Sequence, residues 1–173
     1  MAELAPRERL QPSLLDRLTD DEPRNDIKSR ERRVLSLRTL RQGVLRDLTW
    51  LLNTTNLMSL SSIDTGNLPH LANSVINFGV PDISGQTVSN LNLSKLERGI
   101  RQAIWDFEPR LIRSTVKVKA LTDDGTTAQN KLIFEIEADL WAQPYPERLY
   151  LKTELDLERG FVMLAETGSR SAA

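Results

Sequence analysis

The spacing of apolar residues changes near residue 113 of this 173-residue chain. Before that point, leucine, isoleucine and valine recur every three or four positions, as on one side of a helix. After it, apolar and polar residues alternate, as on a strand with one buried face. This order predicts N-terminal helices followed by a small antiparallel β-meander packed on them, which is an α+β fold.

Two long helices are predicted, over residues 34–52 and 94–107. The apolar stripe of the first comprises Leu37, Leu40, Val44, Leu48, Leu51 and Leu52. The stripe of the second comprises Leu96, Ile100, Ala103, Ile104 and Phe107. Ser94 and Glu97 have the spacing of a capping box, which starts a helix. Pro109 lacks an N–H and disfavours helix at the preceding residue, so the second helix should end at the last residue of its stripe.

The segment between these helices predicts shorter structure. Residues 57–67 are polar and predict a loop. Apolar residues at helical spacing over residues 69–78 predict a short helix that Gly79 ends, with a buried side of Leu71, Val75 and Phe78. Gly43, in the middle of the first long helix, predicts a close crossing by another helix, because glycine is otherwise costly there.

Alternating patterns predict four strands, over residues 114–120, 131–140, 148–157 and 161–164. Antiparallel pairing of the first two would set Lys117 and Lys119 near Glu135 and Glu137 on the solvent face. Opposite charges placed in this way contribute about 0.2–1 kcal/mol per pair. The charge pattern therefore favours a hairpin, although it does not define the register.

A small antiparallel sheet has two edges, and the third predicted strand is one candidate for pairing with another chain. Its exposed face would carry Tyr150, Lys152 and Glu154, and it has no internal proline. A covered edge, or an ordinary self-contained sheet, is an equally good interpretation of this pattern.

Residues 1–33 are predicted to extend a single α+β domain of residues 34–165, and residues 166–173 to form a disordered tail. Between Pro12 and Pro23 the sequence allows two turns of amphipathic helix, with an apolar side of Leu14, Leu15 and Leu18. So short a helix is marginal alone, so it should dock on its own domain or on a partner protein. The basic stretch that follows has no interleaved aromatic residue for base stacking and predicts a solvated linker.

The composition excludes several kinds of chemistry. The chain has no cysteine and one histidine, His70, so it cannot alone build a Cys/His metal site or a thiolate nucleophile. A net charge of −1 gives no overall attraction to nucleic acid. No apolar run approaches the roughly 18 residues of a membrane span. We therefore expect no cofactor, no metal, no nucleic-acid partner and no direct membrane insertion.

The most specific motif is Glu108-Pro109-Arg110, at the junction of the helical and sheet-forming parts. The proline ring restricts the backbone between two opposite charges, so their side chains leave in defined directions. Arginine can recognise a carboxylate in a planar, bidentate way, and glutamate can accept from N–H groups. The triplet could present both charges to a partner, or pair them locally and direct the exit from the helix. The two interpretations are compatible.

Several segments, in this order, resemble the TssE family, the small baseplate subunits of bacterial type VI secretion systems. They are SLLDRL, VLRDLTWLLNTTN, LANSVINFGVPDISG and IRQAIWDFEPRLIR, with LYLKTELDLERG in the strands. The fourth contains the triplet, which is the hallmark of the family. The family is in turn similar to the baseplate wedge protein of contractile phage tails. The segment between Asn53 and Pro69 departs from the family in being more polar.

The resemblance implies a structural part and no enzymatic activity. It implies that Glu108, Pro109 and Arg110 attach to a core bundle made by larger wedge subunits. It also implies that the sheet joins the strand exchange of sheath subunits and templates their first ring. Six copies per baseplate are implied, in a cytoplasmic complex docked at the inner membrane.

The alternative class is a lysozyme-like glycoside hydrolase that uses Glu108 as its acid. Such an enzyme needs two carboxylates about 5–10 Å apart, one of them in an apolar pocket. Asp106 and Glu97 are the candidate partners, but the side chains of Asp106 and Glu108 should diverge at a helix end. Only 5% of the residues are aromatic, and no aromatic-rich loop indicates a sugar cleft. The residues favour an assembly part over an enzyme.

Overall fold

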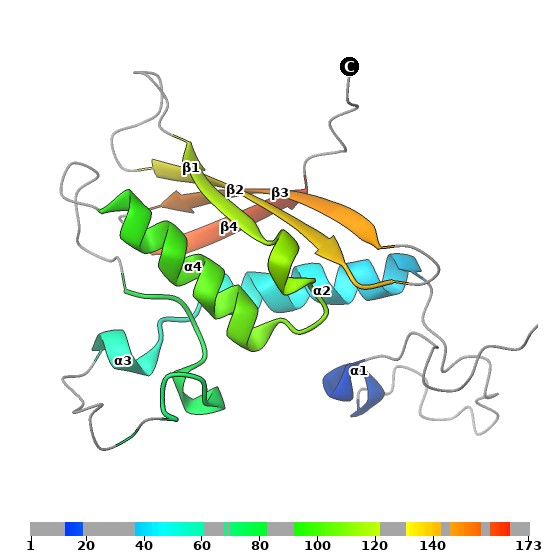
Figure 1. Ribbon diagram of the computed structural model, residues 1–173, viewed down its shortest axis with the longest axis horizontal. Helices are drawn as coiled ribbons and strands as arrows, with labels where there is room; N and C mark the ends of the chain where they lie inside the picture. Colours follow the sequence, from blue (N-terminus) through cyan, green and yellow to red (C-terminus); the bar gives the residue numbers. More distant parts are fainter. Residues whose placement is uncertain are drawn as a thin grey trace, which may run out of the picture.

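The structure, a computed structural model, describes residues 13–18, 37–60, 68, 70–82, 92–121, 131–142, 146–156 and 160–166. Two long helices, α2 (Leu37–Leu52) and α4 (Leu93–Phe107), lie on one face of a four-stranded sheet (Figure 1). The strands are β1 (Lys117–Leu121), β2 (Lys131–Leu140), β3 (Glu147–Asp156) and β4 (Phe161–Glu166). The predicted α+β fold, helices first and then a meander, is confirmed.

The sheet is a meander of order β1-β2-β3-β4, in which all neighbours pair antiparallel. Lys117 pairs with Glu137 and Lys119 pairs with Glu135, so the predicted hairpin and its charge pattern are confirmed. The Lys117 Nζ lies 3.5 Å from Glu137 Oε2. The first strand begins later than predicted, because a 3₁₀ turn, η6 (Arg113–Thr115), precedes it.

The core lies between one face of the sheet and the facing sides of α2 and α4. The helices bury Leu40, Val44, Leu48, Leu51, Leu52, Leu96, Ile100, Ala103 and Ile104. The sheet buries Val118, Leu132, Phe134, Ile136, Ala138, Leu149, Leu151, Leu155 and Val162. Thr153 is also buried, and its hydroxyl donates a hydrogen bond to Phe134 O at 3.2 Å. Leu37 was predicted in the buried stripe but is 39% exposed, since it lies in the first turn of α2.

The segment between the long helices differs from the prediction. Residues 57–60 form a short helix, α3 (Leu57–Leu60), in place of a loop. The predicted α-helix over residues 69–78 is wrong: its described part holds turns and one 3₁₀ segment, η4 (Val75–Asn77), and Val75 is 84% exposed. Asn77 is the reason, because its buried side chain donates to Ala72 O at 2.9 Å and accepts from Met58 N at 3.0 Å. These bonds compete with a regular helix.

Two further capping assignments are corrected. The N-cap of α4 is Asn92, whose side chain accepts from Lys95 N at 2.9 Å, in place of the predicted Ser94. Gly79 does not end an α-helix. Its φ is 128°, and a Cβ there would lie 2.3 Å from Thr54 O. Glycine is needed because two backbone segments meet at this point.

The prediction that the third strand is a pairing edge is wrong, because β3 lies inside the sheet. Lys152 pairs with Glu135 on β2 and with Ala165 on β4, and Glu154 is likewise paired on both sides. Tyr150 is paired with β2. The alternating pattern was correct for the strand, but such a pattern carries no information on strand order.

Several predictions fall outside the described residues, namely the basic linker, the 33/34 domain boundary and the tail beyond residue 166. They remain predictions. Among the helices that the structure describes, none is both long and apolar enough to cross a membrane.

Candidate attachment site

The triplet Glu108-Pro109-Arg110 connects the end of α4 to the end of the sheet. Glu108 is the C-cap residue of α4, and its N–H donates to Ile104 O at 2.9 Å. Two residues later, Arg110 O accepts from Trp141 N at 2.8 Å. The helix therefore stops where the prediction put it, and the backbone is held on both sides of the proline.

The two charges of the triplet pair with each other. Glu108 is only 3% exposed. Its Oε1 accepts from Arg110 Nε at 2.7 Å and from Arg110 N at 3.1 Å, and its Oε2 accepts from Arg110 Nη2. The two charges are thus paired locally, and the presentation of the triplet to a partner, which is compatible with this pairing, stays a prediction. Pro109 is exposed at the tip of the turn.

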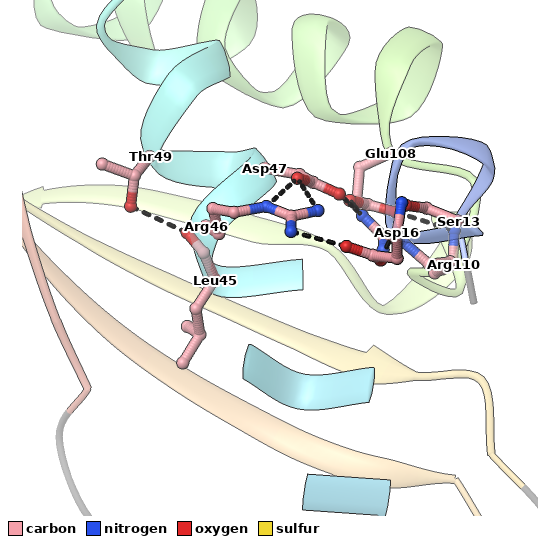
Figure 2. A network of polar contacts seen from close by, with 8 residues as sticks. All are labelled: Ser13, Asp16, Leu45, Arg46, Asp47, Thr49, Glu108 and Arg110. Atoms are coloured by element: carbon pink, nitrogen blue, oxygen red, sulfur yellow. Dashed lines mark hydrogen bonds and ion pairs between the residues drawn. The ribbon is translucent and has the colours of Figure 1, made fainter. Parts of the chain in front are cut away.

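A chain of alternating charges continues from the triplet across α2 to the N-terminal helix (Figure 2). Arg110 Nη2 donates to Asp47 Oδ2 at 2.6 Å, and Arg46 Nε donates to Asp47 Oδ1 at 2.9 Å. Arg46 Nη1 then donates to Asp16 Oδ1 at 2.6 Å. Together with Glu108, these residues form what we call the charge chain. It ties three parts of the chain that are far apart in sequence.

The shifts in pKa favour the fully charged form of the charge chain. Burial lowers the pKa of the Arg110 guanidinium, but hydrogen bonds and attraction from Glu108 and Asp47 outweigh burial and raise that pKa above its ordinary value. The hydrogen bond from Arg46 lowers the pKa of the Asp16 carboxyl, with burial opposing it. The same bond raises the pKa of Arg46.

The N-terminal helix α1 (Leu14–Leu18) contacts the domain through its polar side. Ser13 Oγ caps it, accepting from Asp16 N at 3.2 Å and donating to Asp16 Oδ2 at 2.7 Å. The predicted apolar side faces outward: Leu14, Leu15 and Leu18 are 68%, 46% and 74% exposed. A short helix is present as predicted, and docking on a partner through these leucines remains a prediction.

Gly43 lies beneath the charge chain. A Cβ at this position would be 3.6 Å from both Arg110 Nη1 and Asp16 Oδ2. Both distances are ordinary van der Waals contacts to flexible charged side chains. No backbone of another described helix comes close to Gly43, so the predicted close helix crossing is wrong.

An open groove of about 520 Å³ lies beside the triplet. Its lining is mainly apolar and includes three charged residues: Ser13, Leu15, Asp47, Leu48, Trp50, Leu51, Phe78, Phe107, Glu108, Pro109 and Arg110. Phe78 and Phe107 meet edge to face with ring centroids 5.3 Å apart. Trp50 is 50% exposed, and the Arg46 guanidinium lies 5.0 Å from its ring centroid. Such a groove suits apolar side chains of another protein.

The carboxylates that a glycosidase would need are already engaged. Both oxygens of Glu108 accept from Arg110. Asp106 accepts from Gln102 Nε2 at 2.9 Å, and Glu97 accepts from Ala120 N at 2.7 Å. No cluster of three potential metal ligands occurs within the described ranges. This arrangement does not provide a paired acid and base.

Sequence reasoning missed Arg46, Asp47 and Trp50. Adjacent opposite charges on a helix are typical of a solvated face, and the pattern cannot reveal that Asp47 faces a turn 63 residues away. Trp50 lies off the apolar stripe of α2. A tryptophan on the polar face of a helix was the signal in the sequence that could have indicated a binding surface.

The fold and the site together define an α+β domain in which the turn at Glu108-Pro109-Arg110 is held beside an apolar groove. This arrangement is typical of a protein-binding domain. A sequence model of the family described as baseplate wedge protein gp25 matches residues 38–145. This span is more than half of the chain, so the chain belongs to the baseplate wedge protein gp25 family, the phage-tail relative of the TssE proteins. It is a structural baseplate component of the phage-tail type. Comparisons with curated proteins and with solved structures gave no match.

Proposed function

We propose that the protein is a structural baseplate subunit of a type VI secretion system. In this proposal it attaches to the core bundle of larger wedge subunits and templates the contractile sheath by strand pairing. Family membership supports the baseplate role. The segments shared with TssE support the secretion system over a phage tail, and with it six copies per baseplate in a cytoplasmic complex docked at the inner membrane.

The observation that best supports this attachment is that the turn at Glu108-Pro109-Arg110 is held in one conformation by its neighbours. Pro109 is exposed, while Glu108 and Arg110 on either side are held by the helix end, the sheet end and the charge chain. A turn that is already fixed loses little conformational freedom on binding, so more of the contact energy is available as affinity. The triplet thus contributes shape, and the groove beside it contributes apolar contact.

Helix α1 would add to the same contact. Ser13 and Leu15 line the groove, and Leu14 and Leu18 of the same short helix expose apolar surface. Clustered apolar surface of this kind is typical of a protein interface. The proposed attachment surface therefore comprises Pro109, the groove and the outward side of α1.

The attachment can be tested with two matched tryptophan variants. Trp50 is 50% exposed and lines the groove, whereas Trp141 is 47% exposed and does not. Trp50→Ala should reduce capture of the larger wedge subunits from native cells by tenfold or more, because a central interface tryptophan is often worth about 2 kcal/mol or more. Trp141→Ala should leave capture unchanged. Equal capture by both variants would contradict the groove as the attachment surface.

A further inference from the structure

The outward side of α4 carries arginines gathered around one tryptophan. Arg98, Arg101 and Trp105 are three or four residues apart and lie on the side of the helix opposite its buried stripe. Arg113, in η6, reaches back to the same tryptophan. Its guanidinium lies 5.5 Å from the Trp105 ring centroid, and the Arg101 guanidinium lies 5.4 Å from it. We call these four residues the arginine platform.

The tryptophan of the platform is held in place. Its indole N–H donates to Arg113 O at 2.9 Å, and Arg113 Nη2 donates to Trp105 O at 3.2 Å. A guanidinium that lies over an aromatic ring is attracted by the ring and keeps N–H groups at its edge for a planar anion. Side chains that are ordered in advance lose less conformational freedom when a ligand binds.

The carboxylates closest to the platform in sequence are engaged by other groups. Glu97 Oε1 accepts from Ala120 N on β1 at 2.7 Å. Asp106 accepts from Gln102 Nε2 with both oxygens, at 3.0 and 2.9 Å, and its side chain is only 9% exposed. These two carboxylates therefore offer little further bonding to the arginines of the platform.

The positive charge of the platform is only partly compensated. Arg113 Nη2 lies 3.4 Å from Asp106 Oδ1, a long contact, and the Arg113 side chain is 63% exposed. Within the described ranges, no carboxylate forms an ion pair with Arg98 or Arg101. Cations that lie close together repel one another, and an anion placed among them relieves this repulsion.

We propose that the arginine platform binds an acidic segment of another protein chain. Carboxylates of this segment pair with Arg101 and Arg113 beside the Trp105 ring and with Arg98 along the helix. The planar fork of arginine matches a carboxylate in two parallel hydrogen bonds, which favours Asp and Glu side chains. No residue of the platform lines the groove beside the triplet. The platform is therefore a surface separate from the proposed attachment surface.

A lipid surface fits the platform less well. Helices that lie on membranes insert apolar side chains into the lipid, but the apolar side of α4 is in the core and no large apolar residue of α4 is strongly exposed. Recruitment by charge alone uses clusters of about 4–8 Lys and Arg. Here the carboxylates of Glu97 and Asp106 reduce the net charge of the same helix.

The test uses the full-length protein and an oligoglutamate peptide as the probe, with a glycine–serine peptide as the uncharged control. The NMR signal of each indole N–H reports on one tryptophan, and Trp50→Phe and Trp141→Phe assign the three signals. Trp50 is an internal control, because it also has an arginine over its ring, but that arginine, Arg46, is bonded to two aspartates.

We expect the oligoglutamate peptide to shift the Trp105 signal and to leave the signals of Trp50 and Trp141 in place. Arg101→Gln should weaken the Kd of the peptide by about fivefold or more, the value of one exposed charge contact. The matched variant Arg38→Gln removes one charge from an exposed position of α2 and should leave the Kd nearly unchanged. Arg101→Lys should lie between the wild type and Arg101→Gln, because it keeps the charge and loses the planar fork.

Equal weakening by Arg101→Gln and Arg38→Gln, or a shift of all three indole signals, would mean general charge attraction and would overturn the proposal. So would the absence of any Trp105 shift. Binding to phosphatidylserine vesicles without binding to the peptide would assign the platform to a lipid surface instead. Should a variant not fold, the indole signals of the wild-type protein decide.

Discussion

Removing the Arg110 side chain is the most informative perturbation of the triplet. The Arg110→Ala variant removes the cation beside the Glu108 carboxylate, which is only 3% exposed. Both guanidinium donors are lost, and of the donors that the described residues supply to this carboxylate only the backbone N–H of residue 110 remains. Breaking a buried pair in this way costs about 3–5 kcal/mol, since a desolvated charge remains uncompensated. A domain of this size has about 5–15 kcal/mol of total stability. The variant should therefore lose a large share of its free energy of unfolding.

The converse variant should be milder. Glu108→Ala leaves Arg110 bonded to Asp47, with its side chain 22% exposed to water. We expect a loss of about 1–3 kcal/mol from the broken hydrogen bonds. The double variant should lose less than the sum of the two, with a coupling energy of about 0.5–3 kcal/mol.

Urea unfolding followed by circular dichroism measures these differences, with Arg110→Lys as a control that keeps the charge but loses the planar fork. A loss below about 1 kcal/mol in the free energy of unfolding of Arg110→Ala is the level of an exposed ion pair. It would refute the claim that the Glu108–Arg110 pair stabilises the turn. A loss in Glu108→Ala that exceeds the loss in Arg110→Ala would refute the argument from burial.

Three further predictions concern other parts of the structure. The pKa of the Asp16 carboxyl is lowered in the folded protein, so its contribution to holding α1 is present above its ordinary pKa of 3.8 and is lost as the pH falls through the lowered value. Proteolysis near α1 should therefore increase as the pH falls below 3.8. The Asp16→Asn variant should abolish this pH dependence. Gly79→Ala should lower the stability to thermal unfolding more than Gly160→Ala does, because both glycines have positive φ but only a Cβ at Gly79 would meet backbone atoms. A loss of stability in Gly79→Ala equal to the ~1–2 kcal/mol expected from positive φ alone would contradict the close approach of the two backbone segments. Asn53→Ala should cost about 1–3 kcal/mol in urea unfolding by leaving Val162 N–H and C=O without their partner, and an unchanged midpoint would show that water replaces Asn53.

Local patterns predicted the elements that the core depends on. The change from helical to alternating spacing located α2, α4 and the sheet, because one side of each element packs into the same core. The predicted bounds of β2 are those of the structure. The cross-strand charges of Lys117 and Lys119 correctly indicated the first hairpin, since opposite charges there are on adjacent strands.

Long-range polar contacts could not be predicted in the same way. The spacing of Leu71, Val75 and Phe78 suggested a helix, but the amide of Asn77 reorganised the segment. The triplet was found from its residues, while its partner Asp47 was missed because only the tertiary fold brings α2 to the turn. Strand order also depends on tertiary structure, and this is why the pattern left the third strand as a candidate edge although β3 lies inside the sheet.

The most direct test of the attachment is photo-crosslinking from the exposed tip of the turn. A photo-reactive amino acid replaces Pro109 in the full-length protein, and a matched protein carries it at Lys119, which is exposed on the outer face of the sheet. Irradiation of native cells followed by mass spectrometry should give crosslinks to the larger wedge subunits from position 109 and none from position 119. Crosslinks to those subunits from position 119 alone would contradict attachment through the turn.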